Sequence, residues 1–108
     1  MSFKKITAII RPNLLSKIED ALKDAGVPGV SVSEVKGYGE YANLYAKDGM
    51  VAAIRVEAFI DTECAEAVAQ AIMQAAHTGL EGDGIVAITP VEKIYHVRTK
   101  QACIKNPC

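Results

Sequence analysis

The sequence predicts an α+β domain with the element order βαββαβ, in which two helices cover one face of a four-stranded antiparallel sheet. Three observations support this fold class. Apolar and polar residues alternate in several short segments, as they do in half-buried strands. Two longer segments repeat apolar residues at helical spacing. Glycine, proline or aspartate separates most of these segments and marks the turns between them.

The first half of the chain is predicted to form a strand, a helix and a second strand. Residues Lys4 to Ile10 alternate as a strand, and Pro12 follows its end. Apolar residues recur at helical spacing from Leu14 to Ala25, and Gly26 ends this helix. The second strand begins at Val30 and runs to Gly39.

The middle of the chain is predicted to form a projecting loop, a third strand and a second helix. Residues 40–50 show no clear period and are therefore interpreted as a loop. Residues Val51 to Ile60 alternate and form the third strand. Asp61 is expected to cap a helix over Thr62 to Thr78, whose many alanines give it high helix propensity.

The last strand is predicted over Ile85 to Ile88, and Pro90 is expected to break it. Residues Val91 to Arg98 then form either its continuation or another strand. The complete order is the ferredoxin-like, or split βαβ, pattern. Apolar residues on both faces of the third strand indicate that the face without helices is also buried, so we expect an oligomer.

Composition limits the class of protein. The 108 residues suit one domain over residues 1–108, and half of them are hydrophobic, so a small core can form. Twelve basic residues balance 13 acidic ones, which argues against general binding to nucleic acid. No apolar run approaches the roughly 20 residues of a membrane helix, and the first residues do not form a secretory signal. We therefore expect a cytoplasmic protein without membrane insertion.

Two of the three cysteines, Cys103 and Cys108, lie in an expected flexible tail over residues 100–108. An Asn-Pro turn separates them, so their sulfur atoms could meet as a redox pair, or they could remain two inert thiols. They lack the further ligands of a structural zinc site, and we expect no metal site.

The run from His77 to Gly84 contains three glycines and one aspartate between a predicted helix and a predicted strand. Consecutive N–H groups in such a turn can form a concave anion site, which could hold phosphate oxygens. The same residues could equally serve as a helix C-cap followed by an ordinary turn.

Four ordered motifs make the chain resemble the PII signal-transduction proteins. The resemblance covers residues 4–99. The motifs are Ala8-Ile9-Ile10-Arg11-Pro12, Val32-Ser33-Glu34-Val35-Lys36-Gly37-Tyr38-Gly39, Thr78-Gly79-Leu80-Glu81-Gly82-Asp83-Gly84, and Pro90-Val91-Glu92 followed by Val97-Arg98-Thr99. The resemblance implies a homotrimer that binds adenine nucleotides in clefts between neighbouring subunits. It also implies that the loop over residues 40–50 is the T-loop, which docks on a target protein.

By this resemblance, the glycine run wraps the phosphates and ribose, Arg98 reaches the phosphates, and Ser31 meets the adenine. Glu57 and Phe59 line the base pocket. The complete nucleotide site would comprise Ser31, Gly37, Tyr38, Gly39, Glu57, Phe59, Gly82, Asp83, Gly84, His96 and Arg98.

The chain departs from the classical PII proteins, which it resembles, at several positions. Ile85 replaces a lysine, and His96 replaces an arginine, that contact the terminal phosphates. We therefore expect ADP or AMP, rather than ATP, as the effector. Tyr41 and Ala53 replace two residues of the family's 2-oxoglutarate site, so 2-oxoglutarate sensing is not carried over. The T-loop is shorter, and its uridylylation motif is missing.

These departures resemble the PII-like proteins of inorganic-carbon metabolism, some of which end in a C-x4-C tail. We therefore expect a non-enzymatic regulator that senses ADP or AMP, with bicarbonate as a second effector. Its target would be a membrane transporter or a carboxysome component, and it would hold no prosthetic group. One alternative is a nitrogen-regulatory PII protein acting on an ammonium transporter or a nitrogen-assimilation enzyme. Others are a small phosphatase-like enzyme using Arg11 and Asn43, and a metal-binding trimer of the copper-tolerance type.

Overall fold

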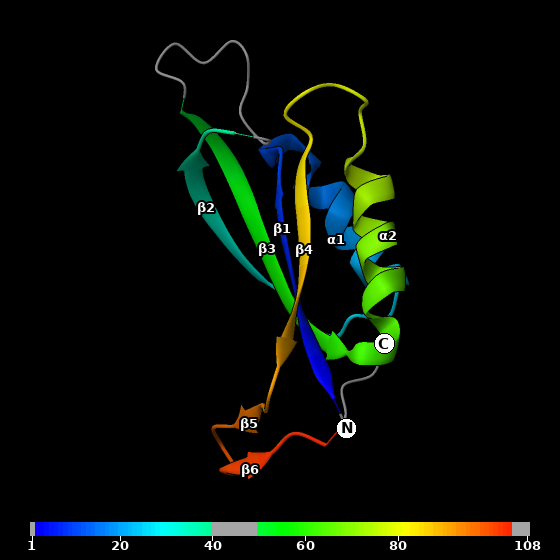
Figure 1. The fold of residues 1–108 in the computed structure, drawn as a ribbon, viewed down its shortest axis with the longest axis vertical. Coiled ribbons are helices and arrows are strands. Elements are labelled where there is room, and N and C mark those ends of the chain that lie inside the picture. Colours follow the sequence, from blue (N-terminus) through cyan, green and yellow to red (C-terminus); the bar gives the residue numbers. More distant parts are fainter. Residues whose placement is uncertain (1, 40–49, 105–108) are drawn as a thin grey trace.

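The computed structural model describes residues 2–39 and 50–104, which form an antiparallel sheet with two helices on one face (Figure 1). The main elements are β1 (Phe3–Ile10), α1 (Leu15–Asp24), β2 (Ser31–Gly37), β3 (Val51–Asp61), α2 (Ala65–Ala76) and β4 (Gly84–Val91). The strand order β2-β3-β1-β4 places β1 and β3 at the centre and leaves β2 and β4 at the edges. This arrangement confirms the predicted ferredoxin-like fold.

The hydrophobic core fills the space between the sheet and the helices. Alternate residues of the central strands point towards the helices, as the period-two pattern predicted. Helices α1 and α2 pack on them with the apolar faces that the helical spacing predicted. The largest fully buried side chains are Ile6, Ile10, Ile18, Leu22, Ile60, Ile72, Val56 and Val68.

The face of the sheet without helices, which we call the open face, is more polar. Thr7 Oγ1 donates a hydrogen bond to Glu57 Oε2 at 3.3 Å, and Lys5 Nζ lies 3.5 Å from the same oxygen. Arg55 Nε donates to Ser33 Oγ at 3.2 Å. These groups tie neighbouring strands together across the open face.

Each helix begins with a short 3-10 turn, η1 (Pro12–Leu14) and η2 (Thr62–Cys64), so α2 is shorter than predicted. Asp61 occupies the N-cap position of η2, as predicted, but its side chain makes no capping hydrogen bond there. Asp61 also ends β3 opposite Phe3 and is buried there. Helix α2 ends at Ala76, because His77 adopts an extended backbone conformation.

Strand β4 continues through Pro90 to Val91, so the expected break at the proline is wrong. Pro90 pairs with Lys4, and β4 lies at the edge of the sheet. A proline is tolerated on an edge strand because its missing N–H group need not serve a further neighbour.

Residues after β4 form a small hairpin and not one long strand. Strand β5 (Tyr95–His96) pairs with β6 (Gln101–Ala102), and the intervening turn contains Lys100 with a φ of 61°. The hairpin lies beyond the end of the main sheet, away from the loop that joins α2 to β4 (Figure 1).

Two predicted segments lie partly outside the described residues. The expected T-loop is described only at Met50, and Lys105 to Cys108 of the expected tail are not described. No helix in the described ranges is long and apolar enough to span a membrane.

Candidate functional site

The loop between α2 and β4, residues 77–83, is organised around the carboxylate of Asp83. This carboxylate accepts hydrogen bonds from the backbone N–H groups of Thr78 at 2.9 Å and Gly79 at 3.0 Å, and from the Thr78 hydroxyl. The Leu80 N–H donates to Thr78 Oγ1 at 3.2 Å. We call residues 77–83 the glycine loop. Its first amides, those of Thr78, Gly79 and Leu80, are directed at side chains of the loop itself.

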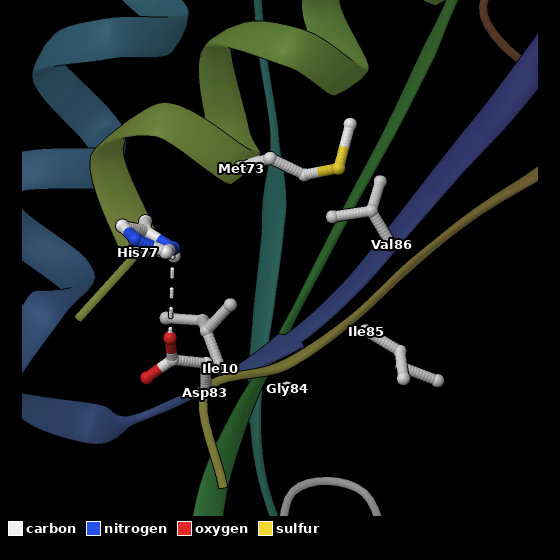
Figure 2. Close-up of a pocket in the computed structure, with 8 residues that line it drawn as sticks. Ile10, Met73, His77, Asp83, Gly84, Ile85 and Val86 are labelled. Atoms are coloured by element: carbon white, nitrogen blue, oxygen red, sulfur yellow. Dashed lines mark ion pairs between the residues drawn. The ribbon is translucent and has the colours of Figure 1, made fainter. Parts of the chain in front are cut away.

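Two further side chains hold Asp83 in place. Arg11 Nε lies 3.4 Å from Asp83 Oδ1, and Arg11 Nη2 donates to the Glu81 carbonyl oxygen at 2.7 Å. His77 Nδ1 lies 3.9 Å from Asp83 Oδ2 (Figure 2). The hydrogen bonds from Thr78, with smaller contributions from Gly79 and Arg11, hold the pKa of Asp83 well below its ordinary value. Asp83 is therefore ionised at neutral pH.

A hollow of about 200 Å³ lies beside the glycine loop (Figure 2). Asp83 and His77 form its polar side, and the exposed side chain of Met73 contributes to its apolar side. Its lining residues are Ile10, Met73, Ala76, His77, Asp83, Gly84, Ile85 and Val86. Pockets for drug-sized ligands usually have at least about 300 Å³, so this hollow alone suits only part of a nucleotide.

The second glycine motif of the predicted site lies at the same end of the sheet but at its other edge. Gly37 ends β2 opposite Val51, and Tyr38 and Gly39 follow it on the surface. Strands β3 and β1 separate β2 from β4. Three inter-strand steps correspond to about 14 Å, so within one protomer this motif and the glycine loop are separate.

A third group of predicted residues lies on the open face. Ser31 pairs with Glu57 between β2 and β3, and the Glu57 carboxylate contacts Thr7 and Lys5. Phe59 is the next residue of β3 on the same face and is 45% exposed. These residues form a continuous surface, and the ring of Phe59 is accessible on it.

The last group, His96 and Arg98, lies far from the glycine loop. Strand β4 alone takes seven residue steps from Gly84 to Val91, or about 23 Å, and the β5–β6 hairpin follows beyond it (Figure 1). Arg98 was expected to lie in the last strand. It lies instead in the turn of this hairpin. One protomer therefore does not bring the whole predicted set together.

Sequence reasoning missed two residues of the site, Arg11 and Thr78. Both lie within motifs that were noted, but neither was assigned to the nucleotide site. Thr78 precedes the first glycine of the loop, where a hydroxyl could have been predicted to bond an aspartate five residues later. Arg11 directly follows β1, which pairs with β4, so the strand order could have placed it at the loop.

The expected pairing of Cys103 with Cys108 stays a prediction, because Cys108 lies outside the described residues. Cys103 is a buried thiol whose N–H donates to the Ile94 carbonyl oxygen at 2.7 Å, at the base of the hairpin. This bond continues the pairing of β5 with β6 by one residue beyond Tyr95 and Ala102. Cys64 takes part in a disulfide. No cluster of three or more metal-ligating side chains occurs in ranges 2–39 and 50–104.

Comparisons with known proteins agree on one family. The model of the family described as "Nitrogen regulatory protein P-II" matches residues 3–101. Proteins of that name from Azospirillum brasilense and Rhizobium meliloti (strain 1021) are 38% and 39% identical over 103 residues, which cover 89% of this chain and 92% of each relative. The crystal structure of Arabidopsis thaliana PII bound to citrate matches with a TM-score of 0.80 and 33% identity, over 94% of this chain and 85% of that one.

Proposed function

Because this chain belongs to the PII family of nitrogen regulatory proteins, we propose that it is a regulator whose binding to a target protein responds to a bound adenine nucleotide. PII proteins are trimeric regulators, not enzymes, and they bind small-molecule effectors and target proteins. The family match thus supports the expectation of a non-enzymatic protein over the phosphatase alternative.

The glycine loop is the observation that carries this proposal. Internal hydrogen bonds to Asp83 give it a fixed shape, and Arg11 attaches it to the end of β1. A fixed loop of small residues lets phosphate oxygens approach backbone N–H groups closely. Gly82 of the loop and Gly84, the first residue of β4, flank the aspartate.

The separation of the predicted site residues supports binding between subunits. One protomer presents the glycine loop at one sheet edge, the Gly37–Gly39 motif at the other edge, and Arg98 on the distant hairpin. In a trimer, edges and hairpins of different subunits adjoin, so a nucleotide at their boundary can contact residues from both. We assign Ser31, Glu57 and Phe59 to the same boundary.

We propose ADP or AMP as the effector. Ile85 occupies the position after the glycine loop where other PII proteins have a lysine, and it presents an apolar, 40% exposed side chain. His96 stands where other PII proteins have an arginine, so the site lacks a second fixed positive charge. The site therefore offers less compensation for the charge of ATP than for that of ADP or AMP.

The names of the relatives favour a target in nitrogen metabolism, such as an ammonium transporter or a nitrogen-assimilation enzyme. This was the alternative in the sequence analysis, and the comparisons support it better than the inorganic-carbon target. An inorganic-carbon target with bicarbonate as effector remains the second candidate. It is supported by the departures from typical PII sequences, including the loss of a lysine at the buried position Ala53.

Calorimetric titration of the purified protein with AMP, ADP and ATP tests the proposal. We expect saturable binding that is stronger for ADP or AMP than for ATP, and that Arg98→Ala weakens. Lys23→Ala, which removes a positive charge from the exposed side of α1, is the matched control. Titration of ADP with and without 2-oxoglutarate, citrate or bicarbonate then shows which second effector changes the affinity for ADP. A response to bicarbonate alone would favour the inorganic-carbon candidate. No saturable binding of any nucleotide at millimolar concentration would contradict the proposal.

A further inference from the structure

Arg11 joins two parts of the chain that are about 70 residues apart in sequence. It directly follows β1, and its guanidinium contacts the glycine loop at two points, the Glu81 carbonyl oxygen and the Asp83 carboxylate. Its side chain is 23% exposed. A guanidinium with donors in a fixed fork is suited to such a two-point contact, because both bonds form without further loss of side-chain freedom.

Through its contact with Asp83, Arg11 is also connected to the start of the loop. Asp83 in turn accepts the Thr78 and Gly79 N–H groups, so one carboxylate connects Arg11 to the start of the loop. The second contact, from Arg11 to the Glu81 carbonyl oxygen, holds the middle of the glycine loop. Within the described part of the chain, the side-chain hydrogen bonds between the loop and the sheet come from Arg11.

The end of the loop is fixed by a different means. Gly84 is the first residue of β4 and pairs with Ile10 of β1. The loop therefore begins at the end of a helix, ends at a paired strand, and is held in between by Arg11. Without Arg11, the Asp83 carboxylate would lose a contact that orients it, so the bonds that it accepts from the Thr78 and Gly79 N–H groups would open more often.

We infer that Arg11 is a positioning residue, which holds the glycine loop in the shape that binds nucleotide phosphates without itself contacting the ligand. The identity of the ligand rests on the proposed function. The effect of Arg11 on the shape of the loop does not depend on that function. Two of the donors of Arg11 are already directed at protein acceptors, and these bonds orient the guanidinium towards the loop.

Preorganisation sets the size of the expected effect. When only a fraction of molecules has the binding-competent loop, the apparent Kd rises by the inverse of that fraction. If removal of Arg11 leaves roughly a tenth of the molecules competent, the Kd for ADP rises about tenfold. Lysine can reach one acceptor but not both in fork geometry, so Arg11→Lys should give a smaller increase than Arg11→Ala.

Two measurements on the full-length protein test this role. Amide hydrogen exchange of Thr78 and Gly79 without nucleotide reports the shape of the loop, and calorimetry reports the Kd for ADP. The variants are Arg11→Ala, Arg11→Lys, Asp83→Asn and the double variant Arg11→Ala with Asp83→Asn. Lys17→Ala, on the exposed side of α1, removes the same charge elsewhere. If Arg11→Ala does not fold, Arg11→Gln replaces it.

We expect faster exchange of both amides in Arg11→Ala, a weaker affinity for ADP, and wild-type behaviour in Lys17→Ala. Because Arg11 acts partly through Asp83 and partly through Glu81, the loss of ADP affinity in the double variant should be smaller than the sum of the two single losses. Unchanged exchange, an unchanged Kd, or additive losses in the double variant would overturn the inference. If the wild type binds no nucleotide, the proposed function fails, and the exchange rates alone decide whether Arg11 fixes the loop.

Discussion

Gly84 lies so close to Ile9 that a Cβ atom at position 84 would come within 1.9 Å of the Ile9 carbonyl oxygen. Its φ of 113° is also outside the range that other residues adopt readily. We therefore expect Gly84→Ala to destabilise the protein on the order of 3 kcal/mol, because the start of β4 must move away from β1. Urea denaturation followed by circular dichroism would measure this change.

Gly29→Ala is the matched control for this prediction. A Cβ at Gly29 would meet no heavy atom within 4 Å, and its backbone is not in the left-handed region. The free energy of unfolding should then change by less than about 1 kcal/mol. Equal effects of the two substitutions would show that the contact between Gly84 and Ile9 does not constrain the loop.

Asp83 should make the stability of the protein depend on pH in the acidic range. Its pKa lies below the ordinary value of 3.8, chiefly because Thr78 donates hydrogen bonds to the carboxylate. A lowered folded-state pKa stabilises the protein above the unfolded-state pKa, and this stabilisation is lost as the pH falls. We expect the free-energy difference between wild type and Asp83→Asn to be largest near neutral pH and to shrink from about pH 5 downwards.

Denaturation curves from neutral pH to the onset of acid unfolding would test this dependence. Asp20→Asn, which neutralises an exposed carboxylate on α1, serves as the control, because it removes the same charge away from the glycine loop. A constant difference for Asp83→Asn would mean that the hydrogen bonds from Thr78 and Gly79 do not favour the ionised carboxylate.

The regular elements could be predicted because their signals are local. Alternation in β1 and β3 and helical spacing in α1 and α2 each follow from the faces buried in the core. The error at Pro90 has a different origin. A proline ends a central strand but not an edge strand, and the position of β4 at the edge depends on the pairing of the whole chain.

The candidate site could be predicted only where it is contiguous in sequence. Residues from His77 to Gly84 form one loop, and their glycines indicated its unusual backbone. The contact of Arg11 with Asp83 spans 72 residues and exists only because β1 pairs with β4. The β5–β6 hairpin consists of two-residue strands, which are too short to show a period, so the position of Arg98 could not be derived from its neighbours.

The open face of the sheet should be buried between subunits. Ala87 is exposed on β4 opposite Thr7, whose side chain contacts Glu57 on this face. We expect the wild type to have three times the subunit mass of 11.5 kDa and Ala87→Arg to dissociate it, because a bulky charge would then enter the interface. Analytical ultracentrifugation would measure both masses.

Ala67→Arg is the control for the interface. Ala67 is exposed on α2, so this substitution introduces the same bulky charge on the other side of the protein. This variant should keep the wild-type mass. A monomeric wild type would contradict the expected trimer, and dissociation by Ala67→Arg would place the interface on the helices and not on the open face.

Ile85 should determine how the site discriminates between nucleotides. It follows Gly84 directly and lines the hollow that Asp83 and His77 border. In Ile85→Lys, an ammonium group at this position could contact a terminal phosphate, so we expect the affinity for ATP relative to AMP to increase on the order of tenfold. Calorimetry with both nucleotides at one salt concentration would measure the ratio, with Ile85→Met as the uncharged control of similar size. If Ile85→Lys changes both affinities equally, the residue lies outside the reach of the terminal phosphates, and the preference for ADP or AMP must have another source.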